Sequence, residues 1–404
     1  MGRRAFPVVP QHHTSIGVTG TNGKTSTVRW IATCLAQLAR SVAQVTTLGS
    51  FLDDEPFEAT SDFDGLVATV KAGIDRGGRF AAIEVTSEAL ARGFARKWPF
   101  RVGVFTNLTH DHLDAHGSPE HYLASKAQLF VGLPRDGVAV LNARDPASPL
   151  LAEVIREARV VSFAVPSRGP PMGTADLEAR SVEVSWAGTR IRLDGRGALA
   201  HVPTELSIPA IGEIYAENAL AALAAALMVG VPPEAAARAL SSAPLVPGRF
   251  QVVSGRDRPR VVVDFAHTPD ALARTLSTAR HLCKGRLWVV FGAGGERDSA
   301  KRAPMGAAAT TADNVVLTSD NPRGEDAGRI AEQIRVGIRG SAEIRVELDR
   351  RCAIRKAICE ADESDVVVIA GKGHEKRQII GTTEVPFDDV QEALAALAER
   401  ARIL

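Results

Sequence analysis

A glycine-rich stretch near the start of the chain has the residue types that bind nucleotide phosphates. Residues 17–26 read Gly-Val-Thr-Gly-Thr-Asn-Gly-Lys-Thr-Ser, between an apolar run and a segment with helical spacing. Glycines let backbone N–H groups converge on a phosphate, and the N-terminus of the following helix adds partial positive charge. Lys24 can reach the outer phosphates and Thr25 can ligate Mg²⁺. Because Val18 stands where the strict Walker A pattern has its first glycine, the stretch is a variant of that loop.

A second stretch, residues 107–116, is dense in histidine and aspartate. His112 and His116 are four residues apart, as zinc ligands on one helix face are, but the glutamate of His-Glu-x-x-His and a third ligand are missing. A polar loop with helix-capping carboxylates is another interpretation. The third, a Mg²⁺-ATP loop facing the P-loop, is favoured by Glu84 at the end of a predicted strand, because Mg²⁺ takes oxygen ligands together with substrate phosphates.

Composition restricts the class of protein. A chain of 404 residues predicts two or three domains, and a net charge of +1 gives no electrostatic reason to expect nucleic acid or a membrane as a partner. The four cysteines show no CxxC or metal spacing, which is typical of a reducing compartment. No signal peptide and no apolar run of membrane-spanning length is recognisable. We expect a soluble, cytoplasmic protein that acts on small molecules.

The elements that must position these residues alternate between strand and helix. Strands are predicted at residues 46–52, 80–85 and 102–106, with helices at 28–38 and 63–73. This alternation indicates a parallel sheet whose ligands lie at the carboxyl ends of the strands, where Thr19, Glu84 and Asn107 fall. Period-two alternation over residues 160–207 predicts an antiparallel appendage, followed by helices at 218–228 and 233–240.

A second α/β unit follows a plausible linker at residues 244–248. Its apolar strands are predicted at residues 261–264, 287–291, 314–318 and 365–370, each followed by a polar or glycine loop. The fold class is therefore α/β: a P-loop domain with a parallel sheet and a small antiparallel appendage, then a Rossmann-like domain. We place the first domain at residues 1–243 and the second at residues 244–404.

The wording of these motifs resembles that of the Mur ligase superfamily, and most of all its MurE family. The resemblance lies in Thr-Gly-Thr-Asn-Gly-Lys-Thr at 19–25, Glu-Val-Thr-Ser-Glu-Ala-Leu at 84–90, residues 105–117 and His-Tyr-Leu-Ala-Ser-Lys at 121–126, and it spans about residues 16–389. In that family the matching lysine is carbamylated and holds a second Mg²⁺ with the matching histidine. The resemblance thus implies Lys126 and His112 for one ion, Thr25 and Glu84 for the other, and Lys24, Glu84, His112 and Lys126 as catalytic residues.

The resemblance also implies two sets of substrate contacts. ATP binding is assigned to Gly20, Thr21, Asn22, Gly23, Lys24, Thr25, Ser26, Asn107 and Asn218, and in the second domain to Arg249, Asp264 and His267. The incoming amino acid is assigned to Arg297, Asp320, Asn321, Arg323, Gly371 and Glu375. The Asp-Asn-Pro-Arg motif at 320–323 is the form associated with meso-diaminopimelate. An arginine fork can bind a carboxylate through two bonds, and acidic side chains can bind ammonium groups, although the motif by itself is also a good β-turn sequence.

Three departures from the family concern mainly the acceptor. Gly17 is so near the chain start that we expect the family's N-terminal UDP-binding domain to be absent. This chain also departs from the family's motifs at the positions that contact the acceptor in the family. In this sequence those positions are Thr60, Ser61, Thr86, Ser87 and Glu88. Near the adenine site, Tyr215 replaces the first asparagine of an Asn-x-x-Asn motif and Phe265 replaces a tyrosine.

We therefore expect an ATP-dependent ligase that joins a carboxylate to a diaminopimelate-like amino acid through an acyl phosphate, with two Mg²⁺ ions and a carbamylated Lys126. The expected acceptor lacks UDP and belongs to a natural-product pathway. The alternatives are a MurE-type peptidoglycan ligase, working without the UDP-binding domain or with a separate acceptor-binding protein, a P-loop ATPase or binding subunit without ligation, and a polyglutamate ligase.

Overall fold

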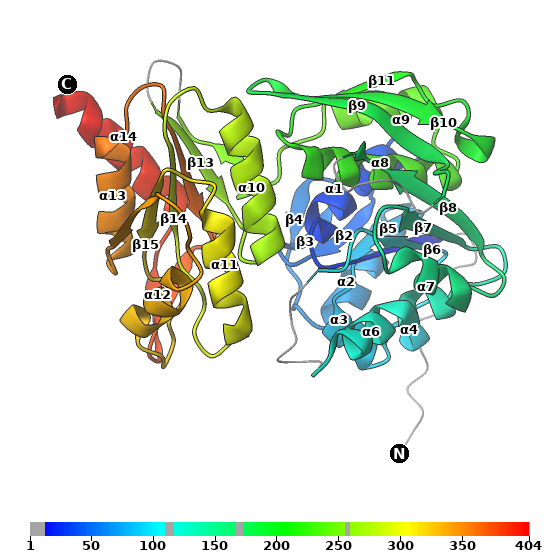
Figure 1. The fold of residues 1–404 in the computed structure, drawn as a ribbon. Helices are drawn as coiled ribbons and strands as arrows, with labels where there is room; N and C mark the ends of the chain where they lie inside the picture. Colours follow the sequence, from blue (N-terminus) through cyan, green and yellow to red (C-terminus); the bar gives the residue numbers. More distant parts are fainter. Residues whose placement is uncertain (1–12, 110–116, 167–172, 255–258, 404) are drawn as a thin grey trace. The chain divides into compact units, whose positions relative to one another are not determined.

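The computed structural model describes residues 13–109, 117–166, 173–254 and 259–403. They form two compact units, and the chain passes from the first to the second between Pro244 and Leu245. Each unit has its own large sheet with helices on both faces (Figure 1). The α/β class and the parallel sheets predicted from the sequence are confirmed. Among the described residues, none of the helices combines the length and the hydrophobicity that crossing a lipid bilayer requires.

The first unit contains one sheet with the strand order β11-β10-β9-β8-β7-β6-β1-β5-β2-β3-β4. Its parallel part is made of β1 (Thr14–Thr19), β2 (Ala43–Thr46), β5 (Phe80–Glu84), β6 (Val102–Phe105), β7 (Val138–Asn142) and β8 (Arg159–Ala164). The central strand β1 pairs with β5 on one side and with β6 on the other. The carboxyl ends of these three strands therefore lie at the same edge of the sheet, as the sequence predicted.

Antiparallel strands extend both ends of this sheet: β3 (Gly49–Leu52), β4 (Glu55–Phe57), β9 (Leu177–Ser185), β10 (Gly188–Gly195) and β11 (Glu205–Ile208). Two expectations were wrong in detail. Residues 46–52 are not one strand, because the chain reverses at Thr47 and Leu48 and β3 pairs antiparallel with β2. The antiparallel part begins only with the pairing of β9 and β10, because β8 pairs parallel with both β7 and β9.

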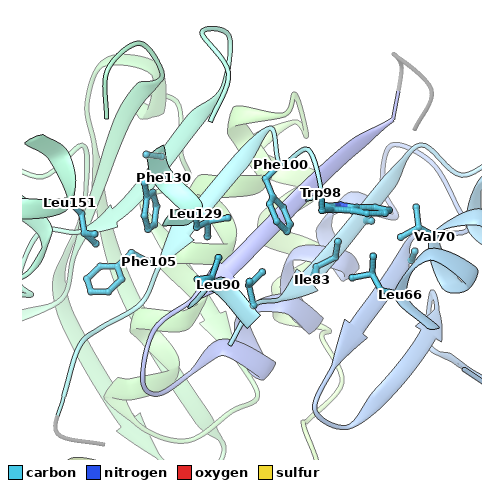
Figure 2. Close-up of a cluster of buried hydrophobic side chains, with 14 of the residues drawn as sticks. Leu66, Val70, Ile83, Leu90, Trp98, Phe100, Phe105, Leu129, Phe130 and Leu151 are labelled. Atoms are coloured by element: carbon cyan, nitrogen blue, oxygen red, sulfur yellow. The ribbon is translucent and has the colours of Figure 1, made fainter. Parts of the chain in front are cut away.

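Helices cover both faces of the first sheet: α1 (Lys24–Leu35), α2 (Phe63–Asp75), α3 (Ser87–Ala91), α4 (Phe94–Lys97), α6 (Pro119–Val131), α7 (Ser148–Val154), η2 (Gly197–Leu199), α8 (Glu213–Met228) and α9 (Pro233–Ser241). Figure 2 shows the apolar cluster that joins one face to α2, α3, α6 and α7, with Trp98, Phe100 and Phe130 among its buried side chains. On the other face α1 packs on α8, whose residues from Tyr215 to Ala226 are all buried. Small alanine side chains permit this close helix packing.

The second unit is a doubly wound domain with the strand order β12-β13-β17-β14-β15-β16. Its strands are β12 (Gln251–Val252), β13 (Arg260–Asp264), β14 (Leu287–Phe291), β15 (Asn314–Leu317), β16 (Glu343–Val346) and β17 (Val366–Ala370), with a separate hairpin of β18 (Arg377–Ile380) and β19 (Thr383–Pro386). The four predicted apolar strands are confirmed. The edge strand β16 was missed, because most of its residues are exposed and its sequence lacks the apolar run of the central strands.

The helices of the second unit are α10 (Pro269–Leu282), η3 (Ser299–Lys301), α11 (Arg302–Ala309), α12 (Ala327–Arg335), α13 (Arg350–Glu360) and α14 (Asp389–Ile403). In Figure 1, α13 and α14 cover one face of the sheet and α10, α11 and α12 the other. The face under α13 and α14 is closed by a buried apolar cluster that includes Trp288, Ile354 and Leu397.

A buried ion pair connects the first residues of α13 and α14. The side chains of Arg350 and Asp389 are 0% exposed and share two bonds, Nε to Oδ1 at 2.8 Å and Nη2 to Oδ2 at 2.7 Å. Arg350 also donates to the carbonyl oxygens of Ala370 at 3.0 Å and Ser319 at 3.4 Å. These carbonyls lie where β17 and β15 end, so the pair anchors the two loops that follow these strands.

Asp389→Ala should destabilise the second unit by about 3–5 kcal/mol, because it leaves the Arg350 guanidinium buried without its counter-charge. Urea unfolding followed by circular dichroism measures the change. Replacing both partners, as Arg350→Met with Asp389→Leu, should recover much of the loss, because no buried charge then lacks a partner.

Glu332→Ala is the matched control, since it removes an exposed carboxylate paired with Arg335. This variant should unfold at the same urea concentration as the parent. Equal midpoints for Asp389→Ala and the parent would contradict the anchoring role of the buried pair.

Candidate active site

The P-loop turns between β1 and α1 in the way that a phosphate site requires. Gly23 has φ +86°, and an added Cβ there would lie 2.2 Å from Oδ1 of Asn218. In the described residues no side chain caps the N-terminus of α1, which starts at Lys24. The first N–H groups of the helix are thus available to an anion. Asn218, which is 3% exposed on α8, lies against the last glycine of the loop.

Oxygen-bearing side chains meet beside this loop. Thr25 Oγ1 donates to Oε2 of Glu84 at 2.8 Å, and Lys24 Nζ lies 3.9 Å from Oε1 of the same carboxylate. Lys24 also donates to the carbonyl oxygen of Thr21 at 2.9 Å. The hydroxyl and carboxylate oxygens of Thr25 and Glu84 are of the kind that Mg²⁺ prefers, so these two residues fit one ion.

Thr47 joins this group, although the sequence did not indicate it. Its backbone N–H donates to Glu84 Oε2 at 3.3 Å, and its hydroxyl lies 3.4 Å from the same oxygen. Thr47 lies in the turn between β2 and β3, and an analysis that places one strand over residues 46–52 cannot find a turn residue there. A correct assignment of the hairpin would have been the signal.

Asn107 supports the P-loop from the adjacent strand end. Its Oδ1 accepts from the N–H of Asn22 at 2.9 Å, its Nδ2 donates to the carbonyl of Asn22 at 3.0 Å, and its own carbonyl accepts from the N–H of Thr21 at 2.8 Å. Asn107 is 1% exposed. Its side chain therefore sets the shape of the loop that binds the phosphates.

Lys126 lies directly behind the P-loop. It is 1% exposed on α6, and its Nζ donates to the carbonyl oxygen of Gly20 at 2.8 Å. The ammonium also lies 4.2 Å from the ring centroid of Tyr122, whose hydroxyl is 3.2 Å from Oγ1 of Thr21. Tyr122 was missed, because a tyrosine one turn before a lysine is a common helix pattern. His112, the expected partner of Lys126, lies outside the described residues.

The residues assigned to the acceptor lie at the starts of two helices. Thr60 and Ser61 are exposed before α2, and the hydroxyl of Thr60 donates to Asp62 Oδ1 at 2.5 Å. Thr86 caps α3 by accepting from the N–H of Ala89 at 3.2 Å. Ser87 is buried and Glu88 exposed in the first turn of α3. Thr86, Ser87 and Glu88 follow β5, the strand that carries Glu84.

In the second unit, two of the three residues assigned to ATP flank Phe265. The Arg249 guanidinium lies 4.4 Å from the ring centroid of Phe265, and the His267 ring lies 4.5 Å from it. Asp264, the last residue of β13, instead accepts from backbone N–H groups, that of Phe250 just before β12 at 2.5 Å and that of Ala266 at 2.9 Å. Burial raises the pKa of Asp264, although these bonds oppose the shift.

The residues assigned to the amino acid converge at the carboxyl ends of β14, β15 and β17. Gly371 has φ +112°, and an added Cβ would lie 2.5 Å from Oδ2 of Asp320, so the two loops approach closely there. Asn321 Nδ2 donates to Glu375 Oε2 at 3.0 Å. The side chains of Arg297 and Arg323 both lie beside Gly294, whose added Cβ would be 3.7 Å and 3.3 Å from them. Two cations and two carboxylates thus occupy one sheet edge.

Buried cations beneath these loops were not recognised from the sequence. Lys372 is 0% exposed and donates to Asn321 Oδ1 and to Glu375 Oε2, each at 3.0 Å. Arg302 is 1% exposed and binds the Glu325 carboxylate through both Nη atoms, at 2.9 and 3.0 Å. The Arg302 side chain lowers the pKa of Glu325 to about 2. The signal for Lys372 was its position between two glycines after a buried strand; Arg302 had none.

Clustered metal ligands are absent from the part of the chain that the structure describes. Among these described residues, no three His, Cys, Asp or Glu side chains gather as a metal ion would require. A zinc site at His112 and His116 falls outside the described residues. The pair of Thr25 and Glu84 still fits Mg²⁺, because that ion completes its coordination with substrate phosphates and water.

Gly23→Ala should lower the affinity for ATP by about tenfold, because the new Cβ displaces the Asn218 amide and the loop. Gly77→Ala is the control, since Gly77 has φ +84° but nothing within 4 Å of an added Cβ. Both variants carry the same backbone strain of about 1–2 kcal/mol. Isothermal titration with an ATP analogue measures the difference, and an unchanged affinity in Gly23→Ala would rule out a nucleotide at this loop.

Comparisons with known proteins cover nearly the whole chain. Residues 18–226 match the Mur ligase middle domain, and residues 248–373 match the glutamate ligase domain of Mur ligases. The UDP-N-acetylmuramoyl-L-alanyl-D-glutamate–2,6-diaminopimelate ligase of Thermosynechococcus vestitus is 41% identical over 98% of this chain and 80% of its own length.

Solved structures agree. A structure of a UDP-N-acetylmuramoyl-L-alanyl-D-glutamate–2,6-diaminopimelate ligase matches with a TM-score of 0.64 and 33% identity over 97% of this chain and 79% of that one. The folylpolyglutamate synthase of Mycobacterium tuberculosis, with a TM-score of 0.72 and 22% identity over 96% of this chain and 90% of its own, shares the fold. The chain belongs to the Mur ligase family of ATP-dependent, amide-forming ligases.

Proposed function

We propose that this ligase adds a diaminopimelate-like amino acid to a carboxylate acceptor through an acyl phosphate. The observation that carries the proposal is the set of charges at the ends of β14, β15 and β17. Arg297 and Arg323 offer guanidinium groups for a carboxylate, while Asp320 and Glu375 offer carboxylates for ammonium groups. A substrate with both kinds of group at both ends matches this arrangement.

The first step joins the acceptor to phosphate. A carboxylate oxygen of the acceptor attacks the γ-phosphorus of ATP, the bond to the β-phosphate oxygen breaks, and ADP leaves. Lys24, at the start of α1, supplies positive charge for the transferred phosphoryl group. Thr25 and Glu84 would hold Mg²⁺, which when bound offsets charge on the phosphate oxygens.

The second step forms the amide. The uncharged amine of the bound amino acid attacks the acyl carbon and forms the C–N bond. The bond between that carbon and the phosphate oxygen breaks, inorganic phosphate leaves with the electron pair, and the attacking nitrogen loses one proton. Glu375 and the arginines would orient the far end of the amino acid, so that the reacting amine has a defined position.

The acceptor is inferred from the relatives of this chain. The relatives are named for UDP-N-acetylmuramoyl-L-alanyl-D-glutamate, and their similarity over nearly all of this chain favours that acceptor. An acceptor without UDP has only the altered residues near Thr60 and Thr86 in its favour, and no comparison supports a natural-product pathway. We therefore infer the muramoyl dipeptide as the first acceptor to test.

Phosphate release from ATP in the presence of Mg²⁺, measured for every pair of candidate substrates, should identify both the amino acid and the acceptor. The candidate amino acids are diaminopimelate isomers, lysine, ornithine and glutamate; the candidate acceptors are UDP-muramoyl dipeptide and free carboxylic acids. We expect turnover only when meso-diaminopimelate and the UDP substrate are both present. Turnover with glutamate alone would indicate a polyglutamate ligase, and turnover without any amino acid would indicate an ATPase.

We also propose that Lys126 is carbamylated and that, together with His112, it would coordinate a second Mg²⁺. The support is its position: the buried Nζ lies 2.8 Å from the Gly20 carbonyl, so a carboxylate formed on that nitrogen would add oxygen ligands next to the P-loop. The ammonium must lose a proton before its nitrogen can bond to the carbon of CO₂.

Lys126→Ala should lower kcat by at least about 100-fold, because a group that binds charge in the transition state is lost. Added formate or acetate should restore part of the activity by supplying the missing carboxylate. Lys71→Ala, at an exposed lysine, is the control and should behave as the parent. Full activity of Lys126→Ala without added carboxylate would refute the role of this lysine.

A further inference from the structure

Lys372 carries a charge in the interior of the second unit, and the proposed reaction does not use it. Its side chain is 0% exposed, whereas that of its ion-pair partner Glu375 is 35% exposed. A buried ammonium is costly unless polar groups surround it. Lys372 meets this requirement with two acceptors, Asn321 Oδ1 and Glu375 Oε2, which lie on two different loops.

These bonds determine how Asn321 is oriented. Its Oδ1 accepts from Lys372 Nζ and from the N–H of Ile379, each at 3.0 Å, so the oxygen must point to these donors. Its Nδ2 is thereby directed to Glu375 Oε2 at 3.0 Å. Lys372, Asn321 and Glu375 form a closed triangle of hydrogen bonds.

The same bonds determine which oxygen of Glu375 is available to a ligand. Both donors from the triangle, Lys372 Nζ and Asn321 Nδ2, end on Oε2. No hydrogen bond to Oε1 is found among the described residues. The carboxylate is therefore held by one oxygen and can present the other to an ammonium group of the amino acid.

The backbone on both sides of Lys372 turns, so that its side chain points into the interior of the second unit. Gly371 and Gly373 have φ +112° and +54°, so the chain turns on both sides of the lysine. The N–H of Glu375 then donates to the carbonyl of Lys372 at 3.0 Å, which closes the turn. Beneath it, Arg350 donates to Ala370 and Ser319, the residues that precede the two loops.

We propose that Lys372 is a positioning residue, which sets Glu375 and Asn321 for the incoming amino acid without touching it. This inference rests on the proposed amino-acid site. It explains why a lysine is present at a fully buried position, where an apolar side chain of equal length would avoid the cost of burying a charge.

The test compares steady-state kinetics of Lys372→Met, Glu375→Gln and the double variant in the full chain. Lys372→Met should raise KM for meso-diaminopimelate by about 10- to 100-fold, the usual effect of removing a charged hydrogen-bond partner. KM for ATP should stay unchanged, because the P-loop residues are untouched. The double variant should be no worse than the more affected single variant, since Lys372 acts through Glu375.

Two further variants separate positioning from folding. Lys372→Gln retains an N–H donor of similar length, so it should raise KM less than Lys372→Met does. Lys356→Met, at a lysine whose side chain is 55% exposed on α13, should leave every constant unchanged. Circular dichroism of each variant checks that the fold is retained.

An unchanged amino-acid KM in Lys372→Met, beside a raised KM in Glu375→Gln, would overturn the positioning role alone. The positioning role would also be overturned if the fold-increase of KM in the double variant equalled the product of the two single increases, because the two residues would then act independently. If Glu375→Gln itself left KM unchanged, the amino-acid site would be wrong and this inference would fall with it. Loss of the fold in both Lys372→Met and Lys372→Gln would assign Lys372 to stability alone.

Discussion

The burial of positive charge is the constraint on which both proposed sites depend. Lys126, Lys372, Arg302 and Arg350 are nearly or fully buried. A buried cation must be surrounded by acceptors, and a packed α/β domain offers unpaired carbonyls mainly where strands end and loops begin. Lys126 accordingly binds the Gly20 carbonyl after β1, and Arg350 binds the Ala370 carbonyl at the end of β17. Each cation thus ties a loop to the scaffold beneath it.

The two units use this arrangement for different chemistry. In the first, the held loop is the P-loop, and Asn107 and Tyr122 add bonds that preserve its shape. In the second, the held loops carry the acidic and basic groups proposed to select an amino acid. Preorganised groups of this kind lower the cost of binding and orienting substrates.

Strands with long apolar runs could be predicted from the sequence. The central strands of both sheets were predicted, and so were the P-loop and the motif at 320–323. Prediction failed where local pattern is weak: the turn at Thr47 divides an apparently continuous strand, and β16 is an exposed edge strand. Thr47 and Tyr122 were missed for the same reason, because their immediate neighbours do not distinguish them from ordinary turn or helix residues. Lys372 does have a local signal, the glycines on both sides of it after a buried strand, but its burial and its partners follow only from the tertiary structure.

The amino-acid sequence by itself determined the class of the fold, the nucleotide loop and the residue types available for catalysis. Apolar periodicity and glycine spacing are local properties, so they can be recognised from neighbouring residues in the sequence. Only the tertiary structure decided that Thr25 shares a hydrogen bond with Glu84, 59 positions later, and that Lys372 lies between Asn321 and Glu375. The physical reason is that a buried polar group takes its partners from whichever strand ends the sheet order brings together, and sheet order is set by packing of the whole domain.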